Sequence, residues 1–278
     1  MRGQRCSKRT PRSMNSLPAP DVSKVSTVYD EIASSRAKIS SVVRRDRSKL
    51  NGSFNGYQGI ITSPVLPTSL YANSVTEKRL FENLYLRPPA GADILKAHAL
   101  PAKFFVCPYC GGRAPSTIDH YLEKALFPEF SLYPENLVPS CRGCNRSQSA
   151  IKNNRCDKLH PYFSPVLSRL QLKCSITIRH VTPHFDLQLH CPNMSANEID
   201  HSKRHRAYIR LERRFARYAS REWDDCREVL RESGGPFAQQ YIMRVANAER
   251  LRYGNNSWRY LFYDGVGNCV PAIDILRA

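Results

Sequence analysis

The chain has 278 residues, of which 42 are Lys or Arg and 24 are Asp or Glu, so its formal net charge is +18 at pH 7. Hydrophobic residues make up 41% of the sequence, which excludes a chain that is disordered or fibrous as a whole, and no apolar run approaches the roughly 18 residues that a membrane span requires. The charge favours nucleic acid as the partner over an anionic membrane or a merely solubilising surface.

The first segment, residues 1–20, carries five basic residues, three prolines and no acidic residue. Such a segment cannot bury enough apolar surface to become ordered, so we expect a disordered basic tail. It lacks the apolar stretch of a secretory signal, although its composition superficially fits an organellar transit peptide.

Residues 21–103 are predicted to form a helical region. Apolar residues recur at three-to-four spacing from 22 to 43, which predicts an amphipathic helix. Glycines at 52, 56 and 59 and prolines at 64 and 67 then indicate a loop. A second helix is predicted from 74 to 86, where it ends before a pair of prolines.

Two CxxC pairs, Cys107 with Cys110 and Cys141 with Cys144, dominate the central segment 104–163. Each pair lets one tight turn offer two sulfurs, and two such turns complete a closed, tetrahedral zinc site. A redox CxxC or two unrelated pairs of buried thiols are the alternatives. Metal binding in a chain without a secretion signal also predicts a reducing compartment, the bacterial cytoplasm.

Four thiolates leave no open position on the zinc ion, so catalysis in this segment needs a second metal. Asp119 and Asn145 offer the oxygen ligands that Mg²⁺ or Mn²⁺ accepts. His120 can take a proton from water near pH 7, and Asn136 can hold its ring by a hydrogen bond. In isolation each of these residues is weak evidence, because an Asn after a turn is more often a cap.

Together these motifs resemble the zinc-containing HNH endonuclease family. The resemblance rests on Cys-Pro-Tyr-Cys-Gly-Gly at 107–112, Ile-Asp-His-Tyr-Leu-Glu-Lys at 118–124, Pro-Glu-Asn-Leu-Val-Pro at 134–139 and Cys-Arg-Gly-Cys-Asn at 141–145. It implies that Asp and His end the first strand of a β-hairpin, that the middle Asn orients the His, and that the last Asn begins an α-helix. A His-Pro-Tyr-Phe segment at 160–163 also occurs in bacterial defence-associated HNH nucleases.

The sequence departs from that family at two positions, since Gln148 stands where many relatives have Lys and Glu123 where many have Pro. The lost Lys removes a candidate phosphate contact. Lys152, Arg142 or Arg146 can compensate for this loss. The candidate phosphate contacts are Lys124, Arg142 and Arg146, and the alternative is that they are simply solvated.

The remaining segment, 164–278, is predicted to add a β-hairpin and helices. Apolar residues alternate over 170–178 and again over 185–189, which indicates two strands around a turn at Thr182 and Pro183. A helix is predicted from 197 to 232, followed by helices over 237–253 and 258–263. The first carries a stripe of arginines that is either a phosphate-binding surface or a solvated face, and its members are Arg206, Arg210, Arg214, Arg217 and Arg221.

The sequence thus predicts an α+β fold with a central ββα-metal module, an N-terminal helical region and a C-terminal hairpin with helices. The resemblance implies a DNA endonuclease that cuts phosphodiester bonds, in anti-phage defence, with a partner ATPase or sensor subunit. The competing functions are a zinc-knuckle nucleic-acid-binding protein without catalysis and an RNA-cutting toxin of the same fold. Phosphate contacts alone carry no sequence information, so cutting is expected to be weakly specific.

Overall fold

The computed structural model describes residues 16–100, 103–146, 148–190, 193–233 and 237–277. Most of the predicted basic tail, residues 1–15, lies outside this part. Helices and three short two-stranded antiparallel sheets make up the described residues, in agreement with the predicted α+β class. None of the described helices is long and apolar enough to cross a membrane.

Short helices make up the N-terminal part of the chain: α1 (Val25–Ser34), α2 (Ser40–Arg45), α3 (Arg47–Asn55), α4 (Tyr57–Thr62), α5 (Val75–Leu86) and the 3-10 helix η1 (Ala92–Ala99). The single helix predicted over 22–43 is wrong, because the chain leaves the helical conformation at Ser35. The predicted glycine loop is wrong as well, since α3 and α4 occupy it. Burial of Leu50, Phe54 and Tyr57 outweighs the roughly 1 kcal/mol that each helical glycine costs.

The helix predicted over 74–86 is confirmed as α5. Its first turn is capped by Ser74, whose side chain accepts a hydrogen bond from the backbone of Glu77. Such a cap satisfies a backbone N–H that the helix itself leaves unpaired.

The central part contains the hairpin of β1 (Thr117–His120) and β2 (Leu137–Ser140), with η3 (Pro128–Phe130) and η4 (Pro134–Asn136) between them. The strands pair so that Asp119 lies opposite Val138 and His120 opposite Leu137. The α-helix expected to begin at Asn145 is absent from the described residues. A minimal hairpin of β3 (Ile151–Lys152) and β4 (Arg155–Cys156) follows there instead.

The C-terminal part contains α6 (Pro165–Arg169), the hairpin β5 (Gln171–Arg179) and β6 (Thr182–His190), and helices α7 (Ala196–Ile209), α8 (Leu211–Ser233), α9 (Ala238–Tyr253), α10 (Trp258–Gly267) and α11 (Val270–Arg277). The predicted hairpin is confirmed, but its turn is formed by His180 and Val181, both with positive φ. The predicted helix over 197–232 is two helices, because Arg210 takes the left-handed conformation with φ 51°.

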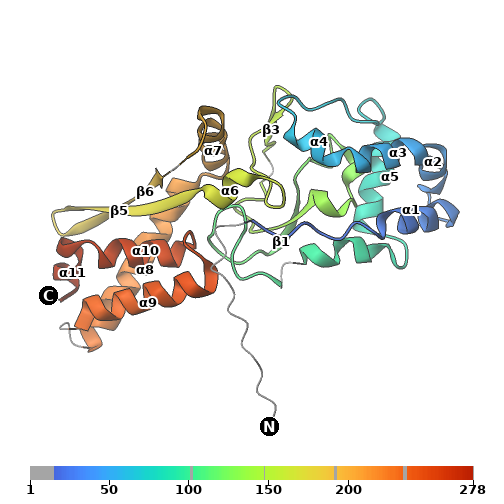
Figure 1. Ribbon diagram of the computed structural model, residues 1–278. Coiled ribbons are helices and arrows are strands. Elements are labelled where there is room, and N and C mark those ends of the chain that lie inside the picture. Colours follow the sequence, from blue (N-terminus) through green and yellow to red (C-terminus); the bar gives the residue numbers. More distant parts are fainter. Residues whose placement is uncertain (1–15, 101–102, 147, 191–192, 234–236, 278) are drawn as a thin grey trace, which may run out of the picture.

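The N-terminal helices lie on one side of the β1–β2 hairpin, and the β5–β6 hairpin with α8 to α11 lies on the other (Figure 1). Aromatic rings join the first side to the centre, since the ring of Phe54 stacks on Tyr133 at 4.8 Å and that of Tyr57 meets Phe130 edge-on at 5.0 Å. On the other side, α8 packs on β6 and α10 on β5. The central hairpin is therefore held from both directions.

Candidate metal centre and the adjoining polar site

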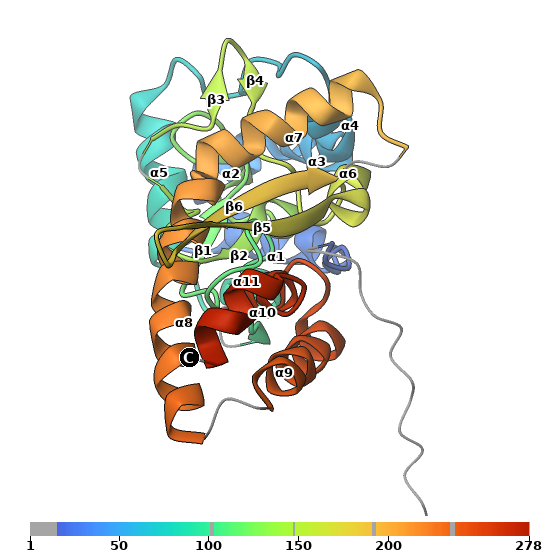
Figure 2. The same cartoon turned by 90° about the vertical axis from the view of Figure 1, so that its left-hand side faces the viewer.

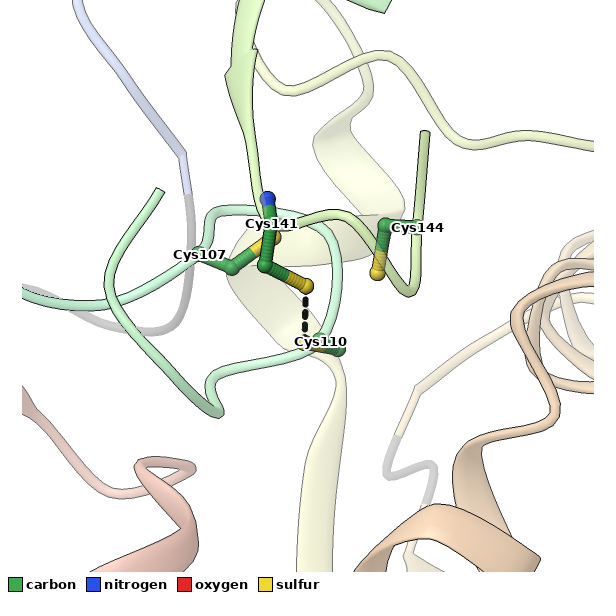
Figure 3. A group of neighbouring side chains, drawn as sticks. All are labelled: Cys107, Cys110, Cys141 and Cys144. Atoms are coloured by element: carbon green, nitrogen blue, oxygen red, sulfur yellow. Dashed lines mark hydrogen bonds between the residues drawn. The ribbon is translucent and has the colours of Figure 1, made fainter. Parts of the chain in front are cut away.

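The four predicted cysteines converge in the folded chain. The sulfurs of Cys107, Cys110, Cys141 and Cys144 lie within 4.8 Å of one another, and all four residues are buried (Figure 3). A tetrahedral zinc ion with Zn–S bonds of about 2.3 Å sets its sulfurs about 3.8 Å apart, and the Cys110 and Cys141 sulfurs are 3.9 Å apart. The cluster can therefore hold a metal ion such as zinc.

Both CxxC segments form the same kind of tight turn. The backbone N–H of Gly111 donates to the carbonyl of Cys107 at 2.8 Å, and that of Asn145 donates to the carbonyl of Cys141 at 3.0 Å. Gly111 has φ 70°, and a Cβ there would lie 2.1 Å from the carbonyl oxygen of Asn256. Glycine is needed at this position because it alone adopts that conformation without strain and admits the neighbouring chain.

Arg214 of α8 lies against the sulfur cluster. Its guanidinium donates to the sulfurs of Cys141 and Cys144, both at 3.2 Å, and its cation lies 5.4 Å from the ring of Trp258. Four thiolates around a divalent ion carry two net negative charges, of which Arg214 offsets one. The predicted role of Arg214 as a phosphate contact is thus replaced by a role at the metal centre, because its N–H groups are taken up by sulfur.

The β1–β2 hairpin runs away from this centre. Ser140, the last residue of β2, directly precedes Cys141, and it pairs with Thr117 at the start of β1. Asp119 and His120 therefore stand at the opposite end of β1, where both are buried. The sulfur cluster anchors one end of the hairpin and leaves the other end to position polar groups.

His120 is held by a backbone carbonyl. Its Nε2 lies 2.9 Å from the oxygen of Ser131, so Nε2 carries the proton and Nδ1 keeps its lone pair. The ring of Tyr85 meets it edge-on at 4.4 Å. Burial, opposed by the Ser131 carbonyl and reinforced by the positive charges of Lys124, Lys158 and Lys96, lowers the pKa of His120 to about 4. The ring is therefore neutral at pH 7.

Asn136 does not orient His120, contrary to the prediction. Its Nδ2 donates to the carbonyls of Leu122 and Phe130, and its Oδ1 accepts from the N–H of Leu122 and the hydroxyl of Tyr57. A buried side-chain amide satisfies all its hydrogen bonds in this way, and here it closes the loop between β1 and β2. The role of orienter belongs to the backbone of Ser131, whose residue type gives no signal.

Tyr57, the aromatic partner of Asn136, also contacts His160. The backbone N–H of Tyr162 donates to Nδ1 of His160 at 3.2 Å, so Nε2 carries the proton and faces the Tyr57 oxygen at 3.2 Å. Tyr57 in turn donates to Asn136. His160 is thus a buried structural group that links α4, the central loop and the segment after β4.

Asp119 has a cationic partner that the sequence did not indicate. The ammonium of Lys158 lies 2.7 Å from Oδ2 of Asp119 and 3.1 Å from the carbonyl of His120. The Lys158 side chain is 2% exposed. Burial lowers the pKa of Lys158, but the charges of Asp119 and Cys156 outweigh this and raise it above its ordinary value. A fixed positive charge therefore stands beside the predicted metal ligand.

Asn145 returns to the strand that carries Asp119. Its Nδ2 lies 3.2 Å from the hydroxyl of Thr117 and 3.3 Å from the carbonyl of Ile118. Alternate residues of a strand share a face, so the Thr117 and Asp119 side chains are on the same side of β1 as the Asn145 amide. Asn145 therefore contacts Thr117, which stands two residues before Asp119 on β1.

Two of the predicted phosphate contacts are engaged within the protein. Lys124 pairs with Glu82 at 3.1 Å. Arg206 pairs with Glu212 at 2.5 Å and donates to the carbonyl of Leu187, and its side chain is only 12% exposed. Neither side chain is presented to solvent as a free cation.

The other three predicted contacts differ from one another. Arg146 donates to the carbonyl of Tyr208 at 2.5 Å and to the side chain of Gln148 at 3.1 Å. Arg142 and Arg210 are exposed, and neither makes an ion pair with the described residues. Arg142 lies inside the second CxxC turn, whereas Arg210 separates α7 from α8.

Comparisons with known proteins give limited information. The chain is 35% identical over 109 residues to a protein of Escherichia phage lambda named Protein ea31, and the match covers 37% of each chain. The chain thus matches little more than a third of the length of this curated relative. No family model matches the sequence, and no solved structure matches it.

Proposed function

We propose that this protein is a metal-dependent DNA endonuclease of the HNH type. The observation that carries the proposal is the end of β1, where a neutral imidazole held by a carbonyl adjoins a carboxylate, with an amide on the same strand face. A hairpin tied to the four-cysteine cluster supports these groups. The net charge of +18 provides the attraction to a polyanionic substrate.

In the proposed reaction, Nδ1 of His120 accepts a proton from the attacking water. The water oxygen bonds to phosphorus, the bond to the 3′ oxygen breaks, and the 3′ oxygen takes up a proton from solvent water, so that 5′-phosphate and 3′-hydroxyl ends result. The Ser131 carbonyl fixes the tautomer, because it accepts from Nε2–H and leaves the Nδ1 lone pair as the basic atom. A low pKa keeps that lone pair free of a proton throughout the neutral range.

Asp119 and Asn145 are the residues that would hold Mg²⁺ or Mn²⁺. Lys158 binds one carboxylate oxygen, Oδ2, so the other oxygen and the carbonyl oxygen of the Asn145 amide are the donors that suit a hard ion. When bound, the ion supplies charge stabilisation at the scissile phosphate. Lys158, whose side chain is 2% exposed, stays on Oδ2 of Asp119 and offsets part of the charge of that carboxylate.

The test is cleavage of matched supercoiled DNA, linear DNA, single-stranded DNA and RNA with Mg²⁺ or Mn²⁺. We expect nicked or linear plasmid from the wild-type protein and none from His120→Ala. The matched control is His184→Ala, which alters an exposed histidine of β6 and should cut normally. Equal cutting by His120→Ala at unchanged zinc content would refute the proposal, and preference for RNA would favour the toxin alternative.

A second candidate function is nucleic-acid binding without catalysis. The ion pair of Asp119 with buried Lys158 favours it, since a carboxylate already neutralised has less attraction for a divalent ion. This candidate predicts tight DNA binding, no cutting under any divalent ion, and no change in Mn²⁺ binding on Asp119→Asn. Mn²⁺ binding measured by electron paramagnetic resonance on the zinc-loaded protein separates the two functions.

A further inference from the structure

A hollow of about 580 Å³ lies where the two CxxC turns meet α8. Four of its arginines come from three places: Arg113 follows the first turn, Arg142 lies in the second, and Arg217 and Arg221 are one turn apart on α8. All four are exposed. We call this set the arginine hollow; α8 runs along one edge of the molecule in Figure 2.

The positive charge of the arginine hollow is not neutralised by the protein. None of its four members makes an ion pair or a side-chain hydrogen bond with the described residues. Two acidic residues also line the hollow. Glu222 is paired with Arg259 at 3.3 Å, so Asp225 is the lining acid that remains to offset the charge of the arginines. Like charges one helical turn apart repel, so this clustering is disfavoured unless an anion binds there.

Close packing of the turns on α8 creates the cluster. A Cβ on Gly143 would lie 2.5 Å from the guanidinium of Arg214, so glycine leaves room for that guanidinium against the second turn. Arg214 is held by the sulfurs and offsets part of the negative charge of the metal centre. One negative charge of a metal-loaded centre then remains beneath the four exposed outer arginines, so most of their positive charge is not offset.

We propose that the arginine hollow binds the phosphate backbone of duplex DNA, a proposal that rests on the proposed function for its choice of DNA as ligand. Guanidinium groups match phosphate oxygens with paired N–H donors. The hollow is lined by Ser116, directly before β1, and His120, the last residue of that strand, lies four residues and about 13 Å further along at roughly 3.3 Å per residue. Such contacts would hold a duplex near the cutting site without reading its sequence.

The test is DNA binding by the full-length, zinc-loaded protein in the non-cutting His120→Ala background. The double variant Arg217→Gln/Arg221→Gln is compared with Arg36→Gln/Arg79→Gln, which removes the same charge from exposed arginines of the N-terminal part. Fluorescence anisotropy with a labelled 20-base-pair duplex gives the affinity at several salt concentrations. Each lost phosphate contact lowers the slope of log K against log salt by about 0.9.

We expect the hollow variant to lose about two units of that slope and at least tenfold in affinity near 0.1 M salt, equally for unrelated sequences. The control variant should lose much less. An equal loss in both variants would overturn the proposal, since it would mean that only total charge matters. Tighter arginine-dependent binding of RNA of the same length would overturn the assignment to DNA. Because binding is measured without cutting, failure of the nuclease proposal remains distinguishable.

Discussion

One end of the β1–β2 hairpin carries four cysteine sulfurs and the other carries the Asp119 carboxylate, and each end receives one cation from a distant part of the chain. At the cysteine end, Arg214 touches sulfurs from outside the cluster and leaves the space between them for a metal. At the Asp119 end, Lys158 binds the predicted ligand itself. A nearby cation would therefore stabilise a metal bound by the cysteines, whereas it would compete with the metal proposed at Asp119.

The largest effect is expected from a substitution at the cysteine end. Cys141→Ser should remove zinc and unfold the protein, because a structural zinc ion contributes about 10–16 kcal/mol to folding. The measurement is metal content together with the far-ultraviolet circular dichroism of the soluble fraction. Cys269→Ser, which lies outside the cluster, should keep both, and a folded, metal-free Cys141→Ser protein would disprove a structural role for the ion.

Substitutions at the Asp119 end should lower the free energy of unfolding by less, and they should act by leaving a charge unpaired. Lys158→Met leaves a buried carboxylate without its partner, which costs about 3–5 kcal/mol, measured by urea unfolding. Asp119→Asn in the same protein should restore most of this loss. The control Lys124→Met breaks an exposed ion pair with Glu82 and should cost at most about 1 kcal/mol. Equal losses in the two Lys variants would contradict the expectation.

Mg²⁺ should affect the stability of Lys158→Met and of the wild-type protein to different degrees. If Asp119 and Asn145 bind the ion, Mg²⁺ should stabilise Lys158→Met more than the wild-type protein, since no ammonium then competes for the carboxylate.

Arg214 tests whether the outer cation matters at the cysteine end. Arg214→Leu should weaken zinc retention about 10–100-fold, as loss of groups that touch metal ligands commonly does. The zinc retention of Arg214→Lys should lie between those of the wild-type protein and Arg214→Leu, because one ammonium cannot bind two sulfurs as the planar guanidinium does. Zinc release to a colorimetric chelator is the measurement. Arg213→Leu, at an exposed neighbouring position, should behave as wild type, and identical release from both Leu variants would argue against the role.

The smallest expected effect is on pH dependence. Burial lowers the pKa of His205 to about 4 and that of His160 well below its ordinary value. Unfolded chains therefore take up protons that the folded protein excludes, so stability is fully present above pH 6.5 and falls as the pH drops below it. For His205 the loss from pH 7 to 5.5 is about 1 kcal/mol, measured by urea unfolding with zinc content checked. His160→Asn should flatten this dependence and His184→Asn should not.

The sequence predicted the cysteine cluster well because CxxC spacing is a local property: two residues between cysteines set one turn whatever surrounds it. Local patterns also predicted β5 and β6, where apolar residues alternate, and α5, which ends before a pair of prolines. Predictions failed where burial overrides local preference. The glycines of α3 and α4 are helical because neighbouring aromatic residues pack into the core.

The sequence singles out the candidate site residues, but it does not show which groups they contact. Asp119, His120 and Asn145 could be singled out from the chain, since chemistry restricts which side chains bind hard ions or move protons. Their partners could not: Lys158 is 39 residues from Asp119, and the Ser131 carbonyl belongs to a backbone group that every residue has. Hydrogen bonds of that kind depend on distance in space, which only the folded chain specifies.

By itself, then, the sequence determined the four cysteines and the excess of positive charge, and it singled out the proposed polar set, because spacing and residue type suffice for these. Tertiary structure alone decided which arginines are free. Arg206 and Arg214 are drawn into contacts with Glu212 and the sulfurs, whereas Arg217 and Arg221 remain exposed on the same helical stretch. A helix repeats every 3.6 residues, but which of its faces meets another element depends on the packing of the whole molecule.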